Sequence, residues 1–321
     1  MSGLLYRLII SNLLYLPVRI FGQVGKIKLL QPNTHFYMET PILENEPSNR
    51  LFKLFGFWLL WILMYIILNI MIQDTSLHST TTAKTLSLIL ASMIFMGSAW
   101  MYLKQVDPKL FQGIRQGYRP RWTTTLLATG FAILEFLFLI CSMYLIELYF
   151  PNFVANFRLE AAEQKEWLIF TYKDLSFPAF FLCSIIGTAL VPAISEELFF
   201  RGALQSILLK KIRRVWIAIG ITALMFSFMH GVFSGIVLFP LAVLYGTLYY
   251  RTKNLFITIV MHLVHNSIVG WVRYTSQNDT NTLIDDWLSA PSCCVGLVVS
   301  VALGYFCFKM LIKQSVHYST T

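Results

Sequence analysis

Long apolar stretches recur along the chain and predict helices that cross a membrane. A helix needs about 20 apolar residues to cross a bilayer, because each residue advances it by about 1.5 Å. Eight stretches reach or approach that length: Leu54–Ile72, Thr85–Leu103, Leu126–Ile146, one that starts near Phe177, Val215–His230, Gly235–Tyr250, Leu255–Val272 and Cys293–Ile312. The pattern therefore predicts an all-α membrane protein with about eight transmembrane helices. The fifth and sixth stretches are short and predict a tight hairpin around the turn Gly231–Ser234.

Composition supports this class, and the placement of charge orients the chain. Of the 321 residues, 56% are hydrophobic and 13% are charged, whereas soluble domains carry roughly 25% charged residues. The net charge of +9 could indicate a nucleic-acid partner, but the basic residues fall on alternate loops, as the positive-inside rule describes. We therefore expect both termini to be cytoplasmic, in a multi-pass protein of the cytoplasmic membrane with lipid neighbours and no nucleic-acid partner. The basic residues expected outside the cytoplasmic segments are Lys84, Arg158, Lys165, Lys173, Arg273 and, within a span, Arg201.

The chain reads as one integral domain in four segments. Residues 1–50 form an N-terminal cytoplasmic or interfacial segment, in which Arg7 and Arg19 interrupt the apolar run and favour an amphipathic surface segment over a secretory signal. Residues 51–176 hold three spans and a long external loop with a short surface helix, whose acids Glu160, Glu163 and Glu166 are interpreted as solvated. Residues 177–272 carry the polar groups described next, and residues 273–321 hold an external loop, the last span and a short tail.

Two carboxylates and a guanidinium stand within the fourth stretch, as Glu196, Glu197 and Arg201. Ionisable groups inside a span are costly and by default indicate function. Glu197 and Arg201 are four residues apart, so they share one helix face and can pair, while Glu196 lies about 100° around the helix. Glu196 is thereby left as a candidate general base. A buried ion pair with a spare acid facing a crevice explains this stretch equally well on its own.

Two later spans carry imidazole and amide groups. His230 ends the fifth stretch, with Phe226 four residues before it to keep water from the ring. His262 and Asn266, also four residues apart, can direct hydrogen-bond donors to one point, as an oxyanion hole requires. His265 lies one turn from His262 and is interpreted as structural. Three spans with such groups in so apolar a chain predict one shared, buried polar cavity.

The order and spacing of these groups resemble those of the CAAX protease and bacteriocin-processing family of intramembrane proteases, which includes the type II CAAX prenyl endopeptidases and the bacterial Abi proteins. The matching motifs are Glu196-Glu197-x-x-x-Arg201, Phe226-x-x-x-His230 and His262-x-x-x-Asn266. The resemblance covers roughly Phe177 to Val272. It implies an eight-helix fold with a site inside the bilayer and hydrolysis of a peptide bond in a peptide or lipidated protein substrate. By motif position, Glu196 and His230 activate water, while His262 and Asn266 stabilise the oxyanion.

A metal remains an open question at this stage. Glu196, His230 and His262 form a His2Glu set like the ligands of catalytic zinc sites. However, the chain has no His-Glu-x-x-His pair on one helix, and one glutamate cannot easily serve as both ligand and base. The cofactor is therefore either zinc or none, and the reaction either glutamate-dependent or that of a metalloprotease.

Two other functions compete with proteolysis. Glu, His and Arg in spans also occur along ion pathways, so a transporter or proton relay is one alternative. Glu135, midway in the third span, favours that alternative, although it can also line the same cavity. The absence of an inverted repeat argues against it. A non-catalytic membrane scaffold or immunity protein with the same fold is the other alternative.

Overall fold

A computed structural model of the chain describes residues 49–73, 81–117, 121–160, 185–275 and 289–316. The chain divides into Met1–Glu44 and Asn45–Thr321, and all described residues belong to the second unit. The predicted N-terminal segment, the start of the fourth span, most of the loop before the last span and the C-terminal tail lie outside the described residues.

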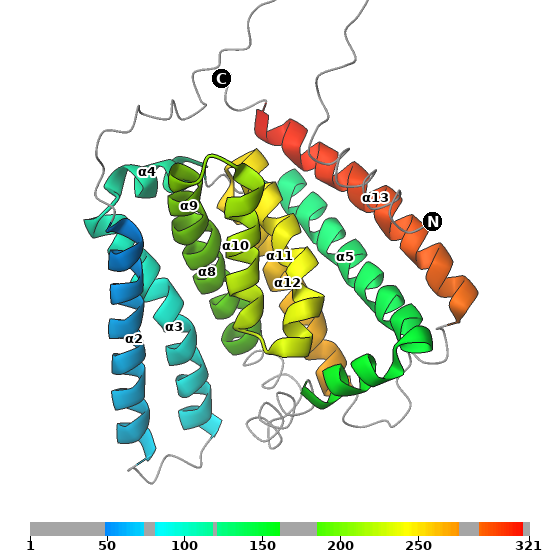
Figure 1. Ribbon diagram of the computed structural model, residues 1–321, viewed down its shortest axis with the longest axis horizontal. Helices are drawn as coiled ribbons and strands as arrows, with labels where there is room; N and C mark the ends of the chain where they lie inside the picture. Colours follow the sequence, from blue (N-terminus) through cyan, green and yellow to red (C-terminus); the bar gives the residue numbers. More distant parts are fainter. Residues whose placement is uncertain (1–48, 74–80, 118–120, 161–184, 276–288, 317–321) are drawn as a thin grey trace, which may run out of the picture. The chain divides into compact units, whose positions relative to one another are not determined.

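The described residues form helices and no strands (Figure 1). The first described helices in chain order are α2 (Arg50–Gln73), α3 (Thr81–Gln105), α4 (Pro108–Gly117), α5 (Trp122–Tyr149) and a short helix at 151–160. The fourth predicted stretch contains η2 (Ile185–Leu190), α8 (Val191–Glu197), η3 (Leu198–Gln205) and α9 (Ser206–Lys211). It is followed by α10 (Val215–Phe228), α11 (Val232–Thr252), α12 (Leu255–Thr275) and α13 (Ala290–Val316).

Five of these helices are long and apolar enough to cross a membrane, namely α2, α5, α11, α12 and α13. The all-α, multi-pass membrane class predicted from the sequence is therefore confirmed. Helix α10 is apolar but shorter, and the fourth predicted stretch is described only from Ile185 onward. The number of eight spans consequently stays a prediction.

Helices pack in close pairs on the two sides of the fourth stretch, Ile185–Lys211. Helix α2 packs on α3, and α5 packs on both α13 and α12. Gly97 of α3 lies directly against the Trp61 ring of α2, so a side chain there would collide with the indole. Gly296 of α13 lies in the same way against the Cys141 thiol of α5. Small residues at such contacts let helices approach closely, which is how helices associate within a membrane.

The fourth stretch is one continuous helix from Ile185 to Lys211, but its geometry changes three times, at the two ends of α8 and again between η3 and α9. The α-helical turns of α8, which carry the two acids, are preceded by π-helical η2 and followed by π-helical η3. The backbone stays in the right-handed helical region at both ends of α8. Pro192 stands in the first turn of α8, just after the change from π to α geometry. Single π turns inside helices occur frequently at functional sites.

Two turns set the positions of α11 and α12. Gly231, between α10 and α11, has φ of 99°, which side-chain-bearing residues rarely adopt. Helix α11 begins directly after it at Val232, so the predicted hairpin turn is shorter than expected. Lys253 ends α11 in the left-handed conformation, and the Asn254 side chain accepts a hydrogen bond of 3.0 Å from the Phe256 N–H at the start of α12.

The short helix predicted in the external loop is present at 151–160, but its last acid is not solvated as predicted. Glu160 Oε2 accepts hydrogen bonds from the backbone N–H groups of Phe233 at 2.8 Å and Ser234 at 3.2 Å. Glu160 therefore caps the free N–H groups in the first turn of α11, where negative charge is favourable. Sequence patterning cannot detect this contact because it joins residues more than 70 positions apart. Glu163 and Glu166 lie outside the described residues.

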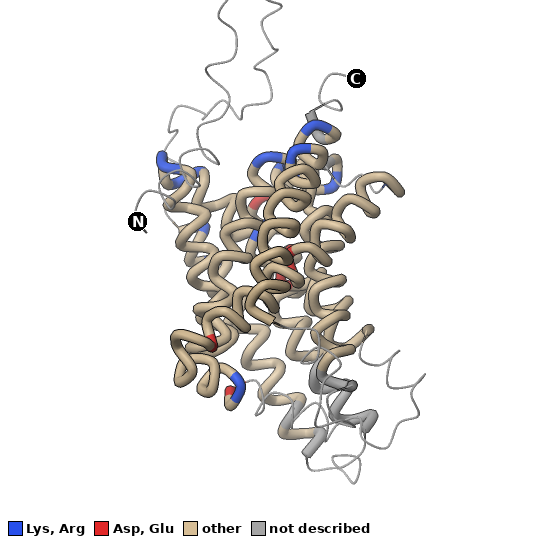
Figure 2. Tube along the Cα trace, turned by 90° about the vertical axis from the view of Figure 1, so that its right-hand side faces the viewer, with Lys and Arg blue, Asp and Glu red and all other residues tan. Residues whose placement is uncertain are grey.

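Most of the basic residues lie at one end of the described helices (Figure 2). At that end, Asp107 connects three elements. Its Oδ2 atom pairs with Arg50 at 2.9 Å and Lys210 at 2.7 Å, and its Oδ1 atom accepts from the Leu110 N–H of α4 at 3.0 Å. The amphipathic helix α4, which the sequence analysis did not predict, is fixed in this way between α3 and the start of α5. Arg201 is different from these basic residues, because it is buried among the helices.

Candidate functional site

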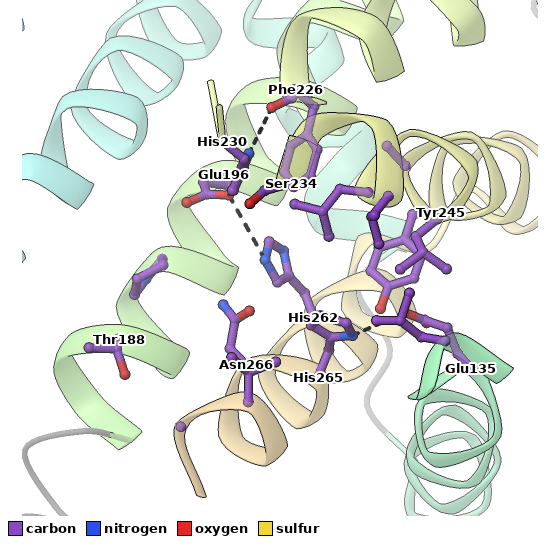
Figure 3. Close-up of a pocket in the computed structure, with 18 of the residues that line it drawn as sticks. Glu135, Thr188, Glu196, Phe226, His230, Ser234, Tyr245, His262, His265 and Asn266 are labelled. Carbon is purple, nitrogen blue, oxygen red and sulfur yellow. Dashed lines mark hydrogen bonds and ion pairs between the residues drawn. The ribbon is translucent and has the colours of Figure 1, made fainter. Parts of the chain in front are cut away.

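Side chains from α8, η3, α10, α11 and α12 meet around a cavity of about 580 Å³. Glu196, His230, His262 and Asn266, the four residues predicted to carry the chemistry, all line this cavity (Figure 3). Phe226 and Arg201 line it too. The packing of the helices brings these groups together. The shared polar cavity predicted from the sequence is therefore present.

Glu197 lies on the closed side of this site. Its side chain is fully buried, and its Oε1 atom accepts a hydrogen bond of 2.8 Å from Arg201, the pair predicted from the four-residue spacing. The same oxygen is 3.0 Å from Nδ1 of His262 on α12. A carboxylate with two donors in a low-dielectric interior is strongly fixed. Glu197 therefore connects α8 to α12 and sets the direction of the His262 ring.

Arg201 is only 1% exposed, and aromatic rings surround its guanidinium group. The guanidinium carbon lies 4.6 Å from the Phe226 ring centroid and 5.7 Å from that of Tyr245. Such contacts favour a cation that has lost its water. Phe226 was expected to pack beside His230. Its ring does so and also covers the guanidinium group of the Glu197–Arg201 pair.

Glu196, one residue earlier, faces the cavity. Its Oε2 atom lies 3.8 Å from Nε2 of His230 and 3.9 Å from Nε2 of His262, too far for direct hydrogen bonds. This oxygen is buried and has no hydrogen-bond partner among the described residues. Two imidazole nitrogens and one carboxylate oxygen therefore surround a space in which a small polar molecule can contact all three.

A contact at Nδ1 fixes the orientation of each of the two imidazole rings, those of His230 and His262. Nδ1 of His230 is 2.8 Å from the Phe226 carbonyl oxygen, which can only accept, so Nδ1 carries the proton and donates. The His230 ring also packs on the Phe226 ring, with centroids 4.6 Å apart. Nδ1 of His262 donates to Glu197 in the same way. Both rings thus present Nε2 to Glu196, the arrangement in which a partner of one ring nitrogen fixes the role of the other.

Several contributors to this site were not identified from the sequence. Tyr245 and Ser234 of α11 line the cavity and carry no motif signal. Glu135 and His265 line the cavity as well. For Glu135, the sequence had already suggested this position as an alternative to a proton pathway. The bond between Glu197 and His262 was missed because the two residues are 65 positions apart and each has a nearer candidate partner in sequence. Contacts of this kind are identified in the structure by the burial of paired charged groups, and the spacing of residues in the sequence does not indicate them.

The described residues do not support a zinc site. Among the parts of the chain that the structure describes, no group of three or more His, Cys, Asp and Glu side chains is arranged to hold a metal ion. The Glu196, His230 and His262 set that the sequence suggested as His2Glu ligands is therefore not found in a ligand geometry, and the metalloprotease alternative lacks support. We derive no step through a metal.

Comparison with known proteins gives one match. No curated protein and no solved structure matches the chain. Residues 178–268 match a family described as type II CAAX prenyl endopeptidase Rce1-like. The matched segment agrees with the stretch from Phe177 to Val272 on which the resemblance was based, and it contains all seven motif residues. The resemblance is therefore confirmed over residues 178–268, which are similar to this family of CAAX prenyl endopeptidases.

Proposed function

We propose that the protein is an intramembrane endopeptidase that hydrolyses a peptide bond through water activated by Glu196 and His230. The observation that carries this proposal is the position of Glu196 Oε2, which lies 3.8 Å and 3.9 Å from the Nε2 atoms of His230 and His262. Hydrogen bonds to a water oxygen are about 2.8 Å long, so one water can contact the carboxylate and an imidazole together. The match of residues 178–268 to a family of endopeptidases supports the same reaction class.

The proposed reaction uses the two sides of the cavity for different tasks. Glu196 takes a proton from the water while the water oxygen attacks the carbonyl carbon of the substrate, and His230 Nε2 accepts a hydrogen bond from the second water hydrogen. The carbonyl oxygen becomes an oxyanion, to which His262 Nε2–H and the Asn266 amide donate. The second water hydrogen stays on the attacking oxygen and only donates a hydrogen bond to His230 Nε2. When the C–N bond breaks, Glu196 returns its proton to the leaving amine. The products are a carboxyl group and an amine, and the site is restored.

Charge balance supports this division of labour. Glu196 and Glu197 bring two negative charges to the site, and Arg201 brings one positive charge. His262 with both ring nitrogens protonated supplies the second positive charge, and its Nε2 then becomes a donor. Because uncompensated charge within a membrane is costly, this neutral set of four groups is the favoured one, and it gives the oxyanion a cationic donor.

We assign the catalytic core to residues 177–272, within an eight-span protein whose termini are both cytoplasmic. The gathering of basic residues at one end of the helices supports this orientation (Figure 2). His230 follows the end of α10 that is remote from the basic residues Arg213 and Arg214. The proposed site therefore lies toward the external half of the cytoplasmic membrane. The substrate class is a peptide or lipidated protein that reaches the site from the membrane.

A proton relay is the competing function that one observation favours. Glu135 and His265 add a second titratable pair to the cavity, 3.1 Å apart, so acid and imidazole groups line two of its walls. Chains of such groups occur in pumps and transporters. This function predicts proton uptake into vesicles that depends on Glu135, with no cleavage of any peptide.

The test is a cleavage assay on the purified full-length chain. Quenched peptide libraries, with and without a C-terminal prenyl group, are incubated with wild type, Glu196→Gln and His230→Ala, each with and without a chelator. Glu147→Gln is the matched control, because Glu147 pairs with Arg158 away from the cavity. We expect the wild type and the control to cleave in both chelator arms, and both site variants to fail. Equal cleavage by Glu196→Gln, or none by wild type on any substrate, contradicts the proposal.

A further inference from the structure

A second carboxylate–imidazole pair lies in the cavity and takes no part in the reaction proposed above. Glu135 on α5 is 5% exposed and His265 on α12 is 8% exposed, and Glu135 Oε1 lies 3.1 Å from His265 Nδ1. Both side chains line the same cavity as Glu196 (Figure 3). The edge of the Phe136 ring covers the imidazole, with centroids 5.8 Å apart. Buried ionisable groups are costly in a membrane unless they are paired, so this contact is a defined feature of the α5–α12 interface.

The position of His265 on α12 relates it directly to the proposed oxyanion donors. His265 stands three residues after His262 and one before Asn266. At about 100° of rotation per residue, His265 lies roughly 60° to one side of His262, and Asn266 lies roughly 40° to the other. The three side chains thus form one arc on the face of α12 toward the cavity. Any rotation of α12 about its axis moves all three together.

Two carboxylates hold this arc from two different helices. Glu197 on α8 is hydrogen-bonded to Nδ1 of His262 at 3.0 Å. Glu135 Oε1 on α5 lies 3.1 Å from Nδ1 of His265, within the distance of an ion pair but not aligned for a hydrogen bond. Tyr245 lies between the two pairs. Its ring packs against His262, with centroids 6.2 Å apart, and its hydroxyl points at the Glu135 carboxylate (Figure 3). Helix α12 is therefore fixed on both sides of the residue that is proposed to meet the oxyanion.

We infer that Glu135 is a positioning residue for this site. Through His265 it fixes the rotation of α12 at which His262 Nε2 and Asn266 face the cavity. Its consequence for catalysis rests on the proposed function, whereas its consequence for the geometry of His262 does not. Glu135 lies on α5, outside the matched segment 178–268, so the functional unit extends beyond that segment to the third predicted span.

The kinetic test compares Glu135→Gln, His265→Gln and the double variant with Glu147→Gln, a matched change on the same helix α5. Small displacements of positioned groups cost up to about a hundredfold in rate, so we expect kcat to fall roughly tenfold or more in each single variant. We expect KM to stay within about twofold, because Glu135 does not contact the reacting atoms. The double variant falls no further than the single ones, since the two residues act as a pair. Unchanged kcat in the single variants, or losses that multiply in the double variant, overturn the inference.

A second measurement works without any cleavage and separates positioning from simple stabilisation. The chain has 6 histidines, so ¹⁵N-histidine labelling gives few ring signals, and His262→Gln assigns those of His262. We expect Glu135→Gln and His265→Gln each to shift the His262 Nε2 signal, and Glu147→Gln to leave it unchanged. If the His262 signal does not move in either variant, the pair is local packing and the inference is wrong. If wild type cleaves nothing while the signal moves, the proposed function fails and the positioning role stands.

Discussion

Glu196 and Glu197 are neighbours in the chain but occupy opposite environments. Glu197 is fully buried and its Oε1 atom has two partners, at 2.8 Å and 3.0 Å. Glu196 keeps 16% of its side chain exposed, and its nearest imidazole nitrogens are 3.8 Å and 3.9 Å away. The protein itself supplies the hydrogen-bond partners of Glu197. Glu196, in contrast, faces the cavity, where a small polar molecule can bind to it. Short contacts identify a structural carboxylate, and contacts slightly too long identify one that is available for chemistry.

Replacing the available carboxylate has the largest expected effect on activity. General bases contribute typically about 10²–10⁴-fold to rate, so we expect Glu196→Gln to abolish measurable cleavage. Its melting temperature, followed by tryptophan fluorescence in detergent, remains close to that of the wild type because Glu196 holds no short contact. A large drop in melting temperature with residual cleavage would reverse the roles assigned to the two acids.

Replacing the structural carboxylate affects stability instead. Glu197→Gln leaves the Arg201 charge buried without its counter-ion, and breaking such a pair costs about 3–5 kcal/mol. We expect a marked loss of folded protein and a lower unfolding temperature in the same detergent. The double variant Glu197→Leu with Arg201→Met removes both charges and recovers most of that stability, although it loses the contact that orients His262. A double variant as unstable as Glu197→Gln would contradict the pair as the cause.

Glu160 provides an intermediate case at the start of α11. It caps two backbone N–H groups, and loss of a helix cap costs typically about 1 kcal/mol. We expect Glu160→Ala to lower thermal stability by that amount, with the change confined to α10 and α11 in hydrogen exchange. Glu160→Gln keeps an acceptor oxygen and serves as the matched control. Equal losses in both variants would show that charge, rather than the acceptor, is what matters there.

Glu147 completes the series with the smallest effect. Its partner Arg158 is 66% exposed, and the Glu147 side chain itself is 35% exposed. Exposed ion pairs contribute roughly 0–1 kcal/mol, so we expect Glu147→Gln to change the melting temperature and the cleavage rate very little. Repeating the melt at high salt checks the assignment, since screening weakens an exposed pair and leaves the Glu197–Arg201 pair nearly unaffected.

The sequence predicted the helical membrane class and the set of polar residues that line one cavity, because both depend on local patterns. Apolar length predicts spans, and four-residue spacing places Glu197 beside Arg201 and His262 beside Asn266. What could not be predicted depends on contacts between helices distant in sequence. Glu160 was interpreted as solvated, and the contact between His265 and Glu135 was not predicted, because neither Phe233 nor Glu135 is a sequence neighbour. The amphipathic helix α4 was missed because it is too short to resemble a span.

The π-helical segments on either side of α8 have a consequence for how this site can vary. A π turn bonds residues five apart instead of four, so it carries one residue more than an α turn of the same span. Deleting a single residue from η3 would let that segment return to α geometry without breaking the helix. Such a deletion would leave Glu197 and Arg201 three or four residues apart, and either spacing keeps the two side chains on one face of a helix. The π-helical segment Leu198–Gln205 can therefore lose one residue while the ion pair that lies beside the candidate site is kept.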